Sequence, residues 1–312
     1  MLSTFSLPSA HCSPLGTTSF HSSKLNTLSS AVISTVLFES DLFVQAYALV
    51  TSSLPKWWWS SQLLILTGTA LTCWSVEGQT LRREIAFANQ EAKQKNPRAK
   101  PKPWTPTWWF VLLGFFGSMS VGGPLFLAQL DSTPKKRPQA RTVPTFLALL
   151  ILLGEASVIA TPFLATMSKG FIYNLVLTHA LFLIPSFLVF NPDSQRRFST
   201  FSLPLLYFIL ALIALASHTT YTLPFVLSPI MKPIILYTTL WSNHCQTSIS
   251  ADLIFNNVLA AAYILRSSWQ LKKPHVGVLL TLAMPVLSVS TVFPLYLGWK
   301  ERQLVTKDKK KA

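Results

Sequence analysis

The sequence predicts an all-α integral membrane protein, a polytopic bundle of seven or eight transmembrane helices. Half of its 312 residues are hydrophobic and only 12% are charged, whereas an ordinary soluble domain carries about 25% charged residues. The mean hydropathy is +0.41. There is too little polar surface to cover a water-soluble body of this size, so the lipid bilayer is the first expected partner.

The basic excess does not indicate a nucleic-acid partner. Lys and Arg number 26 against 11 Asp and Glu, which gives a net charge of +15. These charges lie in the gaps between apolar runs. Basic loops of this kind suit anionic lipid headgroups better than a groove for phosphates.

The expected organisation has three parts. Residues 1–56 form a Ser- and Thr-rich tail with an interfacial helix, residues 57–302 form the transmembrane helical domain, and residues 303–312 form a basic C-terminal tail. The apolar run 31–50 holds Glu39 and Asp41 at its centre, where each charge would cost about 2.5 to 3.5 kcal/mol in the bilayer core. An interfacial helix is therefore expected there rather than a span.

Eight apolar runs approach or exceed the about 20 residues that cross a bilayer core. They are 57–76, 108–130, 145–167, 171–190, 201–217, 222–241, 251–268 and 276–298. In the run 222–241, Pro224, Pro229 and Pro233 remove helix donors and Lys232 adds a charge. This run is either a kinked span or a re-entrant segment, which leaves the total at eight or seven.

Two further features of the sequence are a polar connector and an internal similarity. The polar segment 77–107 continues the first helix and ends in alternating Lys and Pro, which favours an extended hydrophilic connector. The sequences SMSVGGPLFLA at 118–128 and SVSTVFPLYLG at 288–298 are alike. They reflect either a duplicated two-helix unit or a chance similarity.

Polar side chains inside spans are costly and normally face a protein interior or a wet cavity. Glu155 lies near the middle of 145–167, where an unpaired carboxyl group is expected to stay uncharged. It is either a hydrogen bond between helices or a functional proton donor. Glu77 ends the first span and either reaches the headgroups or joins a catalytic group.

Asp252 and Asn256 are four residues apart and share a helix face, with Asn257 beside them. They form either an interfacial helix cap or part of a site. A seven-span topology places Glu77 and Asp252 on the same membrane face, where one pocket can hold both. The predicted catalytic residues are therefore Glu155, Asp252 and Glu77.

Asn256, Asn257, His179 and Asn174 are the predicted substrate-binding residues. His179 and His218 have no second ligand at helical spacing, so neither a metal nor haem is expected. Nucleotide-binding and aspartate-rich diphosphate motifs are absent from the sequence. No cofactor is expected.

Two resemblances add to this reading. The stretch 248–302, which contains SISADLIFNN and PVLSVSTVFPLYLGWKER, resembles a family of small bacterial membrane proteins of unknown function. Over the whole chain, the size, the Ser- and Pro-rich style and the scattered intramembrane carboxyls resemble the integral-membrane terpene cyclases of fungal meroterpenoid and indole-diterpene pathways. This second resemblance implies that a neutral acid protonates a polyprenyl chain and that aromatic side chains hold the resulting cation.

The leading hypothesis is a metal-independent, proton-initiated cyclase, an isomerase or lyase that acts on a lipophilic prenylated substrate in secondary-metabolite biosynthesis. The 21 Phe, 10 Trp and 7 Tyr residues provide π faces that stabilise cations. The alternatives are a small-solute or proton-coupled transporter that uses 222–241 and Lys232, and a non-catalytic membrane scaffold. The expected location is the endoplasmic reticulum or another internal membrane, and the oligomeric state is left open.

Overall fold

The computed structural model describes residues 42–101, 105–132, 142–164, 168–188 and 200–309. The chain forms two units, residues 1–43 and 44–312, and the description below concerns the second. The expected tail 1–30 and most of the expected interfacial helix 31–50 lie outside the described residues.

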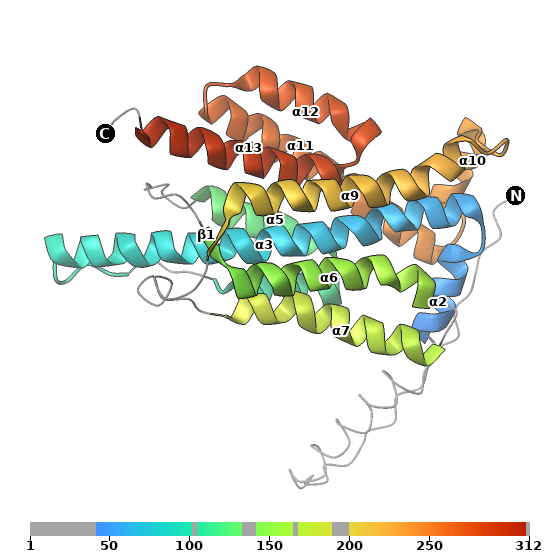
Figure 1. Cartoon of the computed structure of the whole chain (residues 1–312), viewed down its shortest axis with the longest axis horizontal. Coiled ribbons are helices and arrows are strands. Elements are labelled where there is room, and N and C mark those ends of the chain that lie inside the picture. The colour runs from blue at the N-terminus through green and yellow to red at the C-terminus, as the bar shows by residue number, and fades with distance from the viewer. Residues whose placement is uncertain (1–41, 102–104, 133–141, 165–167, 189–199, 310–312) are drawn as a thin grey trace, which may run out of the picture. The chain divides into compact units, whose positions relative to one another are not determined.

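The described part is mainly helical, which confirms the all-α prediction (Figure 1). The N-terminal part contains α2 (Leu42–Thr51), α3 (Leu54–Lys95), α4 (Thr107–Leu112), the π-helical turn η2 (Leu113–Gly117) and α5 (Met119–Ser132). The middle part contains β1 (Thr142–Pro144), α6 (Thr145–Leu164), α7 (Ser168–Phe187) and β2 (Thr200–Ser202). The C-terminal part contains α9 (Leu203–Val226), α10 (Pro233–Leu240), α11 (His244–Gln270), α12 (Pro274–Leu287) and α13 (Val289–Lys309).

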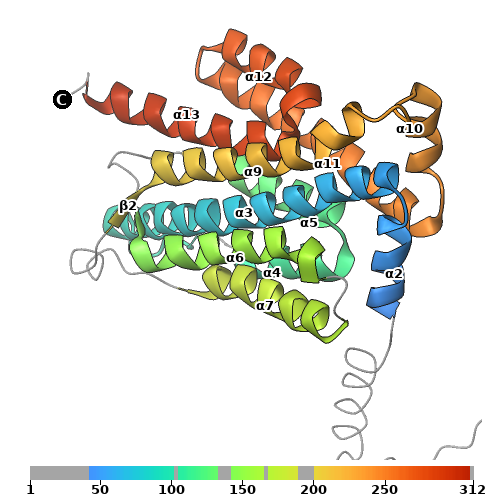
Figure 2. The ribbon, with the colours of Figure 1, turned by 45° about the vertical axis from the view of Figure 1, so that its right-hand side comes forward.

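The long helix α3 is the centre of the bundle. It packs against α9 and α6, which lie on either side of it in Figures 1 and 2, and also contacts α4, α5, α7, α11 and α13. At 1.5 Å per residue its 42 residues rise about 63 Å, roughly twice the thickness of a bilayer core. Its C-terminal part is rich in Lys, Arg and Glu. The predicted polar continuation of the first helix is thus confirmed.

Four of the described helices are long and apolar enough to cross a bilayer. They are α6, α7, α9 and α11, and they correspond to the expected runs 145–167, 171–190, 201–217 and 251–268. Each also exposes large apolar side chains, such as Leu153, Leu177, Leu212 and Val258. Such surfaces suit lipid, and the protein is therefore a helical membrane protein.

Three other expected spans are not continuous helices. The run 108–130 is divided by η2 and the extended residue Ser118. The run 222–241 contains the end of α9, a non-helical stretch from 227 to 232, and α10. The run 276–298 is divided at Ser288, between α12 and α13. Seven or eight spans are therefore not confirmed, because breaks in the backbone divide runs that hydropathy alone predicts as one segment.

Small residues let several of these helices approach closely. A Cβ atom on Gly78 would lie 2.0 Å from Thr107 Oγ1, at the contact between α3 and α4. A Cβ on Gly277 would lie 2.7 Å from Ser268 Oγ, where α11 meets α12. Such contacts are typical of membrane helices, which associate through close van der Waals packing. Between the helices, β1 and β2 form a short antiparallel pair that joins Thr142 to Ser202.

The C-terminal helix extends further than the sequence predicts. Helix α13 continues to Lys309, through most of the segment 303–312 that was expected as a tail. Long-chain Glu, Lys, Arg and Gln residues are good helix formers, so the helix extends past the apolar part of the sequence.

Candidate ligand-binding site

The larger of two described cavities lies between α3, α9, α11 and α12 and has a volume of about 510 Å³. This is within the range of small-molecule sites, about 300 to 1,000 Å³. Its lining consists of Trp58, Trp59, Gln62, His218, Leu253, Ile254, Asn257, Val258, Ala261, Thr281, Met284, Pro285, Ser288, Val289 and Ser290. The lining is mostly apolar, with a few polar groups from several helices.

Two tryptophans contribute aromatic surface to this cavity. The indole N–H of Trp58 donates to Thr222 Oγ1 over 3.1 Å, and that of Trp59 donates to Ser250 Oγ over 2.8 Å. The ring of Trp58 stacks on Phe225 at 4.3 Å between centroids. With their polar ends bound to neighbouring helices, the two indoles are held in fixed orientations beside the cavity.

His218 is the titratable side chain in the cavity lining. Its Nε2 lies 3.1 Å from the carbonyl oxygen of Val286, and its Nδ1 lies 2.6 Å from Gln62 Oε1. Both ring nitrogens thus face oxygen acceptors. A charged imidazolium satisfies both contacts, and a neutral ring satisfies them once the Gln62 amide is turned so that its nitrogen donates.

Ser288 marks a break in the helical wall of the cavity. Its backbone has φ 67° and ψ 152°, a conformation that is nearly restricted to glycine and costs about 1 to 3 kcal/mol. Pro285, one turn earlier, has no N–H to continue the helix. Non-helical backbone at membrane depth is tolerated where it is buried in protein or lines a cavity, and the turn at Ser288 lines this one.

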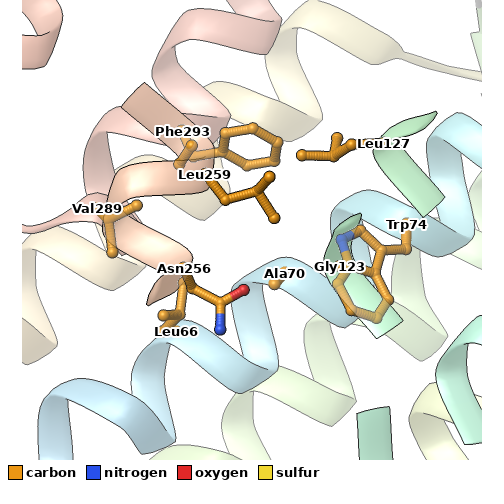
Figure 3. A pocket seen from close by; sticks show the side chains of 10 residues that line it. Leu66, Ala70, Trp74, Gly123, Leu127, Asn256, Leu259, Val289 and Phe293 are labelled. Atoms are coloured by element: carbon orange, nitrogen blue, oxygen red, sulfur yellow. The ribbon is translucent and has the colours of Figure 1, made fainter. Parts of the chain in front are cut away.

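The smaller cavity holds only about 30 Å³, room for a single water molecule. Figure 3 shows the side chains of Asn256, Trp74 and Phe293 around it, with the Asn256 amide beside the α3 residues Leu66 and Ala70. Asn256 Nδ2 donates to the carbonyl oxygen of Asp252 over 2.8 Å. Asn256 is therefore buried between helices and does not line the larger cavity.

Asp252, on α11, binds the first turn of α5. Its Oδ1 accepts hydrogen bonds from the hydroxyl groups of Ser118 and Ser120 and, over 3.3 Å, from the backbone N–H of Ser120. Free N–H groups at a helix start favour a carboxylate, which satisfies the orphan donors and the helix dipole. Asp252 thus caps α5. The predicted cap of its own helix is not observed, because α11 begins at His244 with Asn243 as its N-cap.

Glu155 lies in the contact between α6 and α3. Its side chain is 3% exposed, and its Oε1 accepts a hydrogen bond from Thr72 Oγ1 over 3.0 Å. A Cβ on Gly68 would lie 3.1 Å from Glu155 Oε2, so a glycine makes room for this carboxyl group. The predicted hydrogen bond between helices is observed, and Glu155 lines neither described cavity.

Glu77 belongs to a buried polar cluster. Tyr207 donates to Glu77 Oε1 over 2.7 Å, and Lys300 donates to the hydroxyl oxygen of Tyr263 over 2.8 Å. Burial alone would lower the pKa of Lys300, which lies beyond the last expected span. The electrostatic effects of Tyr263, Glu77 and Glu301, with the Tyr263 hydrogen bond, instead raise that pKa above its usual value. Glu77 thus helps to hold a buried ammonium group.

The remaining predicted residues lie apart from one another. Asn174 joins α7 to α6, because Ser157 Oγ donates to its Oδ1 and its Nδ2 donates to Thr161 Oγ1. His179 Nδ1 lies 2.7 Å from the carbonyl oxygen of Leu175, one turn earlier in α7. Of the seven predicted site residues, Asn257 lines the larger cavity.

The carboxyl groups do not form one shared site in the described residues. Glu77 binds Tyr207 of α9 and Asp252 binds the start of α5, and neither lines either cavity. No three His, Cys, Asp or Glu side chains of the described segments are grouped so that they could hold a metal ion. Of the cavity residues, Trp58, Trp59, Gln62 and Ser288 were not predicted as site residues, and His218 was considered only as a metal or haem ligand.

The fold and the cavity together define the class: a helical membrane protein with a cavity large enough for a small molecule. Residues 206–302 match a family described as a protein of unknown function, DUF2834. The match covers less than half of the chain. It contains the stretch 248–302 that resembles a membrane-protein family of unknown function and extends it by most of α9 and by α10. No terpene cyclase family matches, and no curated protein or solved structure matches the chain.

The matched segment provides most of the cavity. His218, Asn257, Thr281 and Ser288 lie within it, whereas Trp58, Trp59 and Gln62 come from α3 outside it. Glu77, Glu155, Asn174 and His179 also lie outside. The large cavity is thus built from the segment that is similar to this family, with one wall added by the N-terminal part.

Proposed function

We propose that this membrane protein binds a lipophilic small molecule in the cavity between α3, α9, α11 and α12. The observation that carries the proposal is the cavity itself, about 510 Å³ with mainly apolar walls and a polar group at His218 and Gln62. Ile254 and Val258 line the cavity and are also exposed, at 42% and 64%. A lipophilic molecule can therefore reach it from the bilayer.

The chemistry proposed for this site is the proton-initiated cyclisation of a prenylated substrate, in the endoplasmic reticulum or another internal membrane. The indoles of Trp58 and Trp59 support it, since aromatic faces stabilise cations in a water-poor space. Glu155 and Asp252 are bound inside helix contacts, and the titratable side chain on the cavity wall is His218. His218 is therefore the first residue to test as a proton donor or acceptor.

A transporter is the second candidate, and the break at Ser288 favours it. Secondary transporters place their substrate sites at discontinuous helices near the bilayer midplane. Lys232 does not support this role, because it is exposed and precedes the first residue of α10. The transport hypothesis therefore moves from the segment 222–241 to the wall formed by α12 and the start of α13.

The binding proposal is tested by filling the cavity. Met284 is 5% exposed and lines the cavity, whereas Leu282, on the same helix, is 72% exposed and does not. The purified protein in lipid nanodiscs would be labelled with a photoreactive prenyl alcohol. We expect Met284→Trp to abolish labelling and the matched variant Leu282→Trp to leave it unchanged. Equal labelling of both variants would show that the cavity is not the binding site.

Functional assays distinguish cyclisation from transport. Microsomes given an epoxidised prenyl substrate would test cyclisation in the wild type, His218→Gln, Asp252→Asn and Glu155→Gln. Loss of a proton donor or acceptor typically lowers a rate about a hundredfold to ten-thousandfold. Sealed vesicles that accumulate a solute but convert nothing would support the transporter instead.

A further inference from the structure

The hydroxyl group of Thr281 is an unusual feature of the cavity wall. In helices a threonine hydroxyl commonly donates to the carbonyl oxygen four residues earlier, as Thr219 and Thr220 do here over 2.8 Å. Thr281 Oγ1 is buried but has no hydrogen-bond partner among the described residues. Leaving a buried hydroxyl unpaired costs about 1 to 3 kcal/mol, and a ligand group that reaches Thr281 Oγ1 recovers this free energy.

Asn257 offers the complementary group in the same lining. Its Nδ2 donates to the carbonyl oxygen of Leu253 over 2.8 Å, which fixes the amide against its own helix. No hydrogen bond to its Oδ1 is recorded within the described part of the chain. The cavity thus presents a hydroxyl that donates or accepts, from α12, and an amide oxygen that accepts, from α11.

The charge of the lining restricts the ligand further. Its 15 residues include no Lys, Arg, Asp or Glu. An ionised phosphate, carboxylate or amine would lose its hydration there without a counter-charge, which is costly in an apolar environment. His218 does not bind such a group directly, because both of its ring nitrogens already contact oxygen atoms of Gln62 and Val286.

We infer that the ligand of this cavity is an uncharged amphiphile whose hydroxyl or carbonyl group binds Thr281 and Asn257, with its hydrocarbon body against Trp58, Trp59 and Met284. This inference rests on the proposed binding function and specifies the chemistry of its ligand. Phospholipids are excluded as the preferred occupant, because their headgroups are charged. The ligand is a neutral lipid alcohol, ketone or related compound that is dissolved in the bilayer.

The test compares head groups on one skeleton. The full-length protein in nanodiscs would be labelled with a photoreactive prenyl alcohol, and the unlabelled prenyl alcohol, aldehyde, carboxylic acid, amine and hydrocarbon would compete at pH 7. We expect the alcohol and the aldehyde to compete at least tenfold more strongly than the acid, the amine or the hydrocarbon. Thr281→Val keeps the side-chain shape and removes the hydroxyl. This substitution should weaken binding of the alcohol about two- to tenfold, which is the contribution of one neutral hydrogen bond. Binding of the hydrocarbon should not change.

Thr220→Val is the matched control, because Thr220 is exposed and outside the cavity; it should leave all competitors unchanged. If Met284→Trp abolishes labelling but the acid or a phospholipid competes as well as the alcohol, the inference is overturned while the binding function stands. The same holds if Thr281→Val binds the alcohol like the wild type. If Met284→Trp is labelled normally, the proposed function fails, and the inference fails with it.

Discussion

His218 Nε2 lies 3.1 Å from the carbonyl oxygen of Val286 and joins α9 to the last turn of α12. In a continuous helix this carbonyl would accept from the N–H of Ser290. Ser288 leaves the helical conformation between these two residues, and the imidazole contacts the carbonyl in their place. The polar group of the cavity and the break in its wall are therefore parts of one arrangement.

Replacing His218 should destabilise this arrangement. His218→Ala leaves a carbonyl in an apolar region with one donor fewer, and the expected loss is about 1 to 3 kcal/mol in the free energy of unfolding. Unfolding by SDS in detergent micelles measures it. His275→Ala, at an exposed position on α12, is the control and should be near neutral. A His218→Ala variant as stable as the wild type would show that the contact does not contribute to the free energy of unfolding.

The cap formed by Asp252 makes a second prediction. Asp252→Asn keeps an oxygen acceptor for the Ser118 and Ser120 donors, so it should fold with a small loss. Asp252→Leu removes the acceptor and should cost about 1 to 2 kcal/mol, as for a lost helix cap. A double-mutant cycle with Ser120→Ala tests the pair directly. Additive effects of the two substitutions would contradict a direct contact.

The hydrogen bond between Tyr207 and Glu77 predicts a third result. Tyr207 is fully buried and donates to Glu77 Oε1 over 2.7 Å. Tyr207→Phe removes this donor without creating a large void, and we expect a loss of about 1.5 to 3 kcal/mol, since the acceptor is a carboxyl group. Thermal unfolding followed by size-exclusion chromatography measures it. Tyr173→Phe, at a position 68% exposed, should have no effect.

Membrane topology provides a fourth prediction. It concerns the non-helical residues 96–101 and 241–243. Ser60, near the start of α3, contacts Gln246 of α11, whereas residues 96–101 follow the end of α3. The two loops therefore lie at opposite ends of this helix, and we expect them on opposite faces of the membrane. Glycosylation sites inserted in each loop measure this. Modification of both loops in the same membrane preparation would contradict this arrangement.

The sequence was sufficient for the fold class because hydropathy reports how far a segment can be buried in lipid. It identified α6, α7, α9 and α11, and the polar continuation of α3. It did not locate the breaks at Ser118 and Ser288, since these depend on local backbone conformation and on partners from distant helices. Asp252 accepts a hydrogen bond from the backbone N–H of Ser120 beside the first break, and His218 contacts the carbonyl oxygen of Val286 beside the second.

The candidate site was harder to predict, because a polar residue in a span signals a contact but not its type. Glu155, Asp252 and Asn174 are all satisfied by hydroxyl or backbone groups of neighbouring helices. The cavity depends on which helices meet, and helical periodicity does not specify that. His218 was visible in the sequence as a polar residue in an apolar run. Its role depends on Gln62 and Val286, which are far from it along the chain.

Ser288 makes the last prediction, because its backbone conformation is unfavourable for any residue with a Cβ atom. Its φ of 67° and ψ of 152° carry a strain of about 1 to 3 kcal/mol that glycine largely avoids. The hydroxyl contributes little, since its contact with Thr291 Oγ1 is 3.4 Å long. We expect Ser288→Gly to raise the free energy of unfolding by about 1 kcal/mol and Ser288→Val to lower it by at least as much. SDS unfolding in mixed micelles measures both variants.

Lys272 is the matched control for this substitution. It is exposed, follows α11, and has a φ of 60°, so Lys272→Gly relieves a positive φ away from the cavity. Both glycine variants should gain stability, but only Ser288→Gly should change the labelling of the cavity by a photoreactive prenyl alcohol, because only Ser288 lines it. Loss of stability in Ser288→Gly would show that the side chain, and not the backbone, maintains the break. Equal labelling of the two variants would show that the strained turn at Ser288 does not affect ligand binding.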